Sequence, residues 1–171
     1  MQVSGFTIRE AVKRWEMIRE ASQKQWGDSL FLFEKDDKMS LDDIMKAYKE
    51  AERAVASAQT AQSRFNLHVK VKVLGEEMTL AEAVKLVGGA GRAEKMWKVH
   101  ATNNGQDRYS RTEITRSKES EFAKRSMSIK DCLKRATEAA KFAGALRAAI
   151  AEGNSTKVEA SSIGLDPKLL D

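Results

Sequence analysis

The sequence predicts a mainly α-helical fold with short β-strands, in which two pseudo-symmetric helix–strand–helix–strand halves form a helical bundle that assembles into an oligomer. Apolar residues recur at helical spacing through most of the 171 residues, and the chain holds a single proline to interrupt them. Short extended runs separate these segments, and the two halves resemble each other. A chain of this length is the size of one domain.

Helix starts are marked four times by a hydroxyl residue followed three positions later by a carboxylate, the pattern that caps a helix N-terminus. The pairs are Thr7 with Glu10, Ser40 with Asp43, Thr79 with Glu82, and Ser128 with Asp131. We expect the helices to end at Gly27–Asp28, at Asn66, at Asn103–Gly105 after an interruption over Gly88–Gly91, and at Gly153–Asn154.

Strands are expected between the helices. Residues Leu67–Val73 alternate strictly between apolar and other side chains, which predicts a half-buried strand, and Gly75–Glu76 is typical of a turn. Leu30–Phe33 fits either a short buried strand or an arm that packs on a partner. We also expect short extended runs at Glu113–Thr115 and Ser155–Glu159, and a loose tail over 161–171.

An internal duplication is the most informative feature. Residues Met39–Asn66 align without a gap onto Met127–Asn154, and Thr7–Lys13 matches Thr79–Lys85 at five of seven positions. The alternative is chance similarity between amphipathic helices of like composition. The gapless register favours two related units, over 7–74 and 79–160.

The composition limits the class of protein. The single cysteine, Cys132, excludes an intrachain disulfide, and the two histidines, His68 and His100, have no metal-binding neighbour at helical spacing. No apolar run approaches the roughly 20 residues that span a membrane. We expect a cytoplasmic protein with no signal peptide, membrane contact, metal or cofactor.

Positive charge is concentrated in the second half of the chain. Eleven Lys and Arg face five Asp and Glu between Arg108 and Arg147, whereas the whole chain carries a formal charge of +5. This excess favours an anionic partner, although a solvated helix face explains it equally well.

Three short motifs resemble the septicolysin-like family of small bacterial and phage proteins. They are Thr79–Ala83, which resembles a "TLTEAL" helix start, Arg108–Ile114, which resembles "RYSRSEIK", and Asn154–Glu159, which resembles a terminal "N-x-T-x-E/V" turn. The Gly88–Gly91 stretch and Ser155–Thr156 depart from that pattern. The resemblance implies a small helical fold and leaves the activity open.

The preferred binding segment is Arg108–Tyr109–Ser110–Arg111, with Arg116 and Lys118 extending its charge. Guanidinium forks hold phosphate and a flat ring stacks on a base. Pairing of the arginines with carboxylates such as Glu113 is the structural alternative.

A second candidate set recurs in both halves, at the end of a helix and the start of a strand. It comprises Asn66, His68 and Lys70 in one half, and Asn154, Thr156 and Lys157 in the other. Asparagine at a helix C-terminus is more often only a cap. Gly88–Gly91 fits a kink better than a phosphate-binding loop, because it lacks the lysine and hydroxyl of a P-loop.

These observations predict a non-enzymatic protein that binds a small anionic ligand, in its most specific form a nucleotide. One version is a phage or bacterial protein that sequesters a cyclic nucleotide or an ADP-ribose-type signal. The alternatives are nucleic-acid binding by the basic second half, and a scaffold or protein-inhibitor role through protein–protein contacts. No catalytic residues are predicted.

Overall fold

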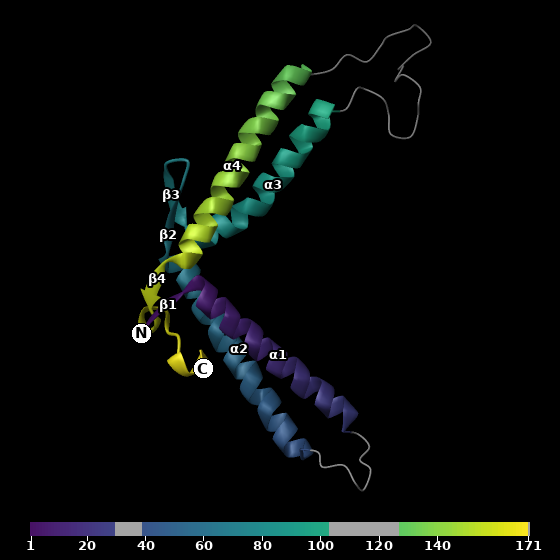
Figure 1. The fold of residues 1–171 in the computed structure, drawn as a ribbon, viewed down its shortest axis with the longest axis vertical. Helices are drawn as coiled ribbons and strands as arrows, with labels where there is room; N and C mark the ends of the chain where they lie inside the picture. Colours follow the sequence, from purple (N-terminus) through teal and green to yellow (C-terminus); the bar gives the residue numbers. More distant parts are fainter. Residues whose placement is uncertain (30–38, 103–126, 171) are drawn as a thin grey trace, which may run out of the picture. The chain divides into compact units, whose positions relative to one another are not determined.

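The computed structural model describes residues 1–29, 39–102 and 127–170, and in these ranges it is mainly helical with short strands, as the sequence predicts (Figure 1). The elements are β1 (Gln2–Ser4), α1 (Gly5–Asp28), α2 (Leu41–His68), β2 (Lys70–Val73), β3 (Glu76–Thr79), α3 (Leu80–Thr102), α4 (Ile129–Ser155) and β4 (Lys157–Glu159). Leu30–Phe33 and Glu113–Thr115 lie outside the described residues.

The chain divides into two compact units. The first comprises Met1–Val71, Met78–Ala81 and Ala151–Asp171, and the second comprises Lys72–Glu77 and Glu82–Ile150. Each unit contains most of one pair of helices.

Helix α1 begins earlier than expected. Ser4, rather than Thr7, is the N-cap: its side chain accepts a hydrogen bond of 3.2 Å from the Thr7 backbone N–H. Ser4 ends β1 in an extended conformation, so its backbone already has the geometry that an N-cap requires. The N-cap predicted at Thr7 is therefore wrong, because the helix begins three residues earlier.

The expected caps of α2 and α4 are confirmed. Ser40 Oγ accepts from the Asp43 backbone N–H at 3.1 Å, and Ser128 Oγ accepts from that of Asp131 at the same distance. Each hydroxyl also donates to the aspartate carboxylate. Helix α2 continues to His68, two residues past Asn66, and α4 ends at Ser155.

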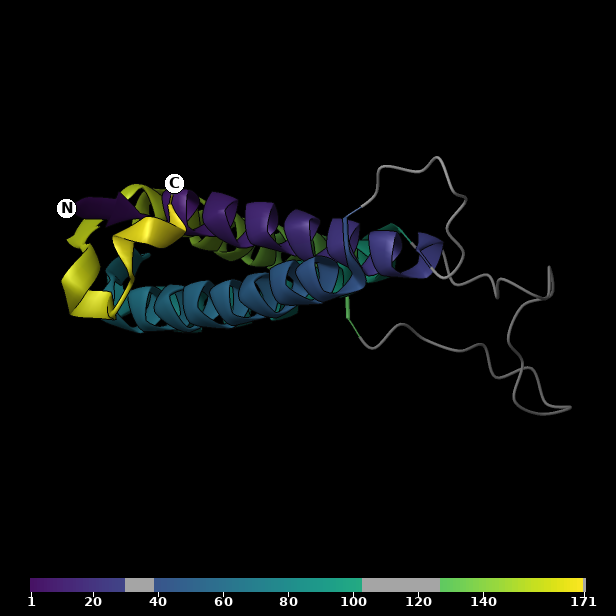
Figure 2. The ribbon, with the colours of Figure 1, turned by 90° about the horizontal axis from the view of Figure 1, so that it is seen from below.

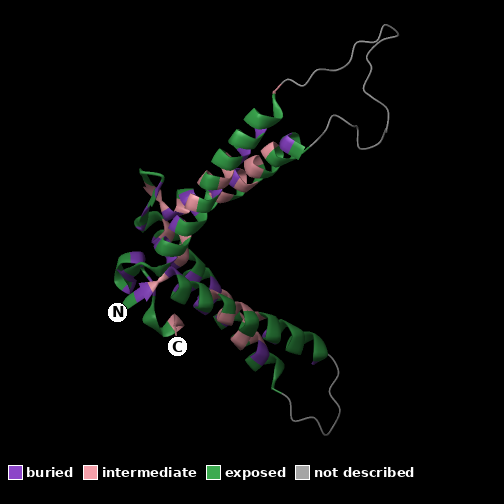
Figure 3. Ribbon diagram, turned by 45° about the horizontal axis from the view of Figure 1, so that its top comes forward, coloured by how far each residue is buried: buried purple, intermediate pink, exposed green. Residues whose placement is uncertain are grey.

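Helices α1 and α2 pack as an antiparallel pair in the first unit (Figure 2). Ile8 and Ala11 of α1 and Ile44, Ala51 and Val55 of α2 are buried. The alanines let the two backbones approach closely, and the buried stripe is confined to one side of each helix (Figure 3).

The chain termini are tied to this unit by a strand pair of which the sequence predicted only β4, within the extended run Ser155–Glu159. Strand β1 pairs antiparallel with β4, and Val3 lies opposite Val158 in the register. Both valines are buried, and the Met1 amino group lies 3.0 Å from Glu159 Oε2.

The C-terminal segment differs from the loose tail expected over 161–171. Two 3-10 turns, Ala160–Ile163 and Pro167–Leu169, follow β4. Ile163 and Leu165 are buried, and the Leu169 carbonyl accepts hydrogen bonds from Arg14 and Trp15 of α1. Two apolar side chains are enough to pack a segment whose composition is typical of a loop.

Strands β2 and β3 form a hairpin, of which only β2 was expected. Val71 and Val73 are buried while Lys70 and Lys72 are exposed, which confirms the alternation from Lys70 on. The predicted start at Leu67 is wrong, because Leu67 and His68 belong to α2. The turn lies at Leu74–Gly75, where both residues have positive φ, so Glu76 already belongs to β3.

Helix α3 continues through Gly88–Gly91, which the sequence predicted as an interruption. Glycine costs about 1 kcal/mol in a helix relative to alanine, and the turns on either side hold the helix despite that cost. A phosphate-binding loop at these glycines is thereby excluded.

The internal duplication stays a prediction, and burial agrees with it. Each half has the order strand–helix–helix–strand in the described residues. Aligned positions of α2 and α4 are buried in both helices: Ile44 and Cys132, Val55 and Ala143, Ala58 and Leu146, and Ala61 and Ala149.

Candidate functional site

The preferred binding segment falls between α3 and α4. Arg108, Tyr109, Ser110, Arg111 and Arg116 lie outside the described residues. Helix α3 ends at Thr102 before this segment, and the structure resumes at Met127 after it. The described part of the candidate site is therefore the end of the α3–α4 pair.

The second candidate set lies in the first unit. Asn154 is buried, and its Oδ1 accepts a 3.3 Å hydrogen bond from Arg9 of α1. Asn66 accepts at 2.9 Å from Gln62, one turn earlier in α2. Both asparagines therefore serve internal hydrogen bonds, which agrees with their structural interpretation.

The other four members of that set are on the surface. His68, Lys70, Thr156 and Lys157 are exposed. The Thr156 backbone N–H and side chain both bond to the Glu152 carbonyl, which extends the last turn of α4. Asn154 lies at the start of α1, where Gly5 is in close contact with Asn154 and with the ring of Phe65.

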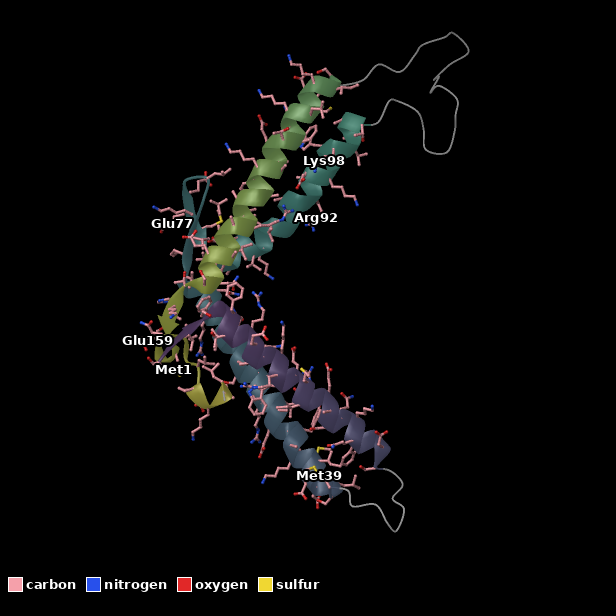
Figure 4. All side chains as sticks on the ribbon, viewed as in Figure 1. Met1, Met39, Glu77, Arg92, Lys98 and Glu159 are labelled. Carbon is pink, nitrogen blue, oxygen red and sulfur yellow. The ribbon has the colours of Figure 1, made fainter. Side chains whose placement is uncertain are left out.

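In the second unit, Glu94 of α3 joins the two helices. Its carboxylate accepts from Lys98 Nζ at 2.7 Å, and Arg147 of α4 approaches to 3.9 Å. Figure 4 shows Lys98 and Arg92 on this helix. The hydrogen bond from Lys98 is the main reason that the pKa of Glu94 lies below its ordinary value.

An aromatic contact lies nearer the end of the pair. The Arg135 guanidinium carbon is 5.2 Å from the centre of the Trp97 ring, within the range of a cation–π interaction. Trp97 is half-buried and Arg135 is exposed. A flat ring beside a guanidinium group is a surface on which an anionic aromatic ligand can stack.

Positive charge exceeds negative charge around this contact. The described residues of the second unit include ten Lys and Arg against six Asp and Glu. Among the residues that the structure describes, no carboxylate lies within ion-pair distance of Lys130, Lys134 or Lys141. A surface hollow is lined by Met127, Asp131, Lys134, Arg135 and Glu138.

The lowered pKa of Glu94 predicts how the stability of the protein changes at acid pH. A carboxylate with a pKa below its unfolded value, about 4.3, stabilises the fold above that pH, and this stabilisation is lost as the pH falls. We expect Glu94→Gln to reduce the acid-induced loss of stability between about pH 5 and 3, measured by urea unfolding at several pH values. Glu138→Gln, an exposed control on α4, should leave the pH dependence unchanged, and equal effects of the two substitutions would contradict the assignment.

The described ranges contain neither a candidate metal site nor a candidate membrane-spanning helix. No group of three or more His, Cys, Asp or Glu side chains in 1–29, 39–102 and 127–170 is arranged to hold a metal ion. Across the same ranges, no helix has the length and apolar character needed to cross a bilayer. Cys132, in α4, is buried.

The contact between Trp97 and Arg135 was not found from the sequence. Nothing in the sequence brings a residue of the next helix to Trp97. The excess of positive charge after Arg108 was the one sequence signal that pointed to this region.

Comparison with known proteins supports the fold alone. No family model and no curated protein matches the chain. A solved structure described as a functionally unknown conserved protein from Corynebacterium diphtheriae is similar, with a TM-score of 0.63 and 18% identity. The match covers 93% of this chain and 100% of that one.

Proposed function

We propose that this chain is a non-enzymatic binding protein for a small anionic ligand, with a nucleotide as the best-fitting class. The observation that carries the proposal is the uncompensated positive charge at the end of the α3–α4 pair, next to the contact between Trp97 and Arg135. Phosphate needs cations, and a base needs a flat surface on which to stack.

The contacts would come from the segment that joins these two helices. Arg108 and Arg111 would hold phosphate through their guanidinium forks, and Tyr109 would stack on the base. Lys130 and Lys134 would add a field that attracts the anion. In its most specific form the protein sequesters a cyclic nucleotide or an ADP-ribose-type signal of a bacterium or phage, and no step of chemistry is assigned.

Isothermal titration calorimetry tests this proposal. The probes are ATP, a cyclic dinucleotide and ADP-ribose, titrated into the wild type and into Arg108→Ala and Arg111→Ala. We expect one probe to bind the wild type and each substitution to abolish measurable binding, while helical circular dichroism stays unchanged. Arg53→Ala, on the exposed face of α2, is the matched control and should bind like the wild type.

Two results would overturn the nucleotide proposal. Undiminished binding in both Arg108→Ala and Arg111→Ala would remove the site from the 108–111 segment. Binding of DNA or RNA with an affinity that falls steeply with salt, together with no binding of the small probes, would instead favour the nucleic-acid alternative.

A further inference from the structure

A groove lies between the end of α1 and the start of α2. It has a volume of about 200 Å³ and is lined by Ser22, Gln23, Trp26, Ile44, Met45 and Tyr48. Apolar side chains are exposed around it: Trp26 is 40% exposed and Leu41 is 44% exposed. Met39 lies just before α2 and is 52% exposed (Figure 4).

Acidic residues flank this groove. Asp28 ends α1, and Asp42 and Asp43 lie in the first turn of α2; all three are exposed. Over residues 22–29 and 39–48, these three aspartates outnumber Lys24 and Lys46. An occupant of this groove would combine apolar side chains with positive charge.

The first two turns of α4 have that combination. Ile129 is 43% exposed and Leu133 is 52% exposed, and the two are four positions apart, so they lie on one side of the helix. Lys130 and Lys134 follow them directly. Over residues 95–102 and 127–135, five Lys and Arg stand against one aspartate, Asp131.

We propose that the start of α4 in one copy of this chain docks in the α1–α2 groove of a second copy. Ile129 and Leu133 would enter the groove between Trp26 and Met45, as an amphipathic helix does in helix-in-groove recognition. Lys130 and Lys134 would face Asp28 and Asp42. Complementary charge of this kind sets register and selects the partner.

The two surfaces belong to different parts of the chain, so the contact is heterologous. A pair of copies keeps one unused groove and one unused α4 start, so association continues until a ring closes or a filament forms. The proposal shares Lys130 and Lys134 with the proposed ligand site, but it uses neither Arg108 and Arg111 nor the contact between Trp97 and Arg135. Asp28, Asp42 and Leu133 take part in the docking contact alone, so their substitutions test it separately from ligand binding.

Sedimentation velocity of the full chain over a concentration series tests the proposal. We expect the wild type to associate with rising concentration. The double variants Lys130→Glu/Lys134→Glu and Asp28→Lys/Asp42→Lys should each weaken association by about tenfold or more, as should Leu133→Glu, which places a charge in the groove. Lys72→Glu/Lys168→Glu carries the same charge change on exposed positions elsewhere and should associate like the wild type.

Mixing the two reversed variants gives the decisive result. The reversed α4 start of one variant matches the reversed groove of the other, and the unchanged α4 start of the second matches the unchanged groove of the first. The mixture should therefore associate, whereas neither variant associates alone. A wild type that stays monomeric, reversed variants that associate like the control, or a mixture that stays monomeric would each overturn the proposal. Arg108→Ala should associate normally, which separates this test from that of ligand binding.

Discussion

Phe65→Ala is expected to lower the free energy of unfolding by about 3–5 kcal/mol, the range for removing a fully buried aromatic ring. Phe65 is the largest fully buried side chain of the described residues. Its ring lies against the backbone of Gly5, and its carbonyl accepts the 3.0 Å hydrogen bond from Val69 that closes α2. The ring therefore packs where α1 begins and α2 ends, and urea unfolding followed by circular dichroism measures its loss.

Phe6→Ala is the matched control for this prediction. Phe6 lies in the first turn of α1, is 47% exposed and has Arg9 over its ring at 6.0 Å. Its removal should cost about 1 kcal/mol or less, since an exposed cation–π contact contributes about 0.5–1 kcal/mol. A loss for Phe65→Ala no larger than that for Phe6→Ala would contradict the packing described for the first unit.

Gly5→Ala is expected to destabilise the protein by about 1–3 kcal/mol, the cost of overpacking a core. A methyl group at Gly5 would lie 2.6 Å from Asn154 Oδ1 and 2.8 Å from Phe65 Cε1, closer than atoms in contact can approach. Both neighbours are buried, so neither can move away without disturbing the Arg9 bond or the aromatic packing. Helix propensity alone predicts the opposite sign, because alanine is the better helix former.

Gly144→Ala separates the two effects. Gly144 lies within α4, and no heavy atom lies within 4 Å of a methyl group placed there. This substitution should stabilise the protein by about 1 kcal/mol, measured in the same unfolding experiment. A stabilising Gly5→Ala would show that α1 does not approach Asn154 as closely as the structure indicates.

The features that local chemistry determines were predictable. Ser40 and Ser128 cap their helices because the hydroxyl and the carboxylate three residues on form bonds within one turn. The alternation of Lys70–Val73 predicted a strand for the same reason: the pattern is complete within the strand itself. These two signals predicted where α2 and α4 begin and where β2 lies.

The features that depend on distant residues were not predictable. Strand β1 has three residues, and its partner β4 lies at the other end of the chain, so no periodic pattern marks it. The tail packs because Arg14 and Trp15 of α1 bond to the Leu169 carbonyl, which the sequence around Leu169 does not reveal. Gly88–Gly91 stays helical because propensity is a weak preference that flanking turns override.

In the candidate site, too, some features could be predicted from the sequence and others depended on how the helices pack. Asn66 and Asn154 were recognised as equivalent positions, and their internal hydrogen bonds favour a structural role over ligand binding. The Arg108–Arg111 segment stays a prediction from residue chemistry. The contact between Trp97 and Arg135 required the packing of two helices and adds an aromatic surface to the region that charge alone had indicated.

Native mass spectrometry of freshly purified protein tests the central claim, the binding of a small anionic ligand, most directly. We expect the wild type to carry an additional small mass that matches a phosphate-bearing molecule, or to acquire one when ATP, a cyclic dinucleotide or ADP-ribose is added. Arg108→Ala and Arg111→Ala should show the protein mass alone. A wild type that retains only the protein mass with every added nucleotide would contradict the claim.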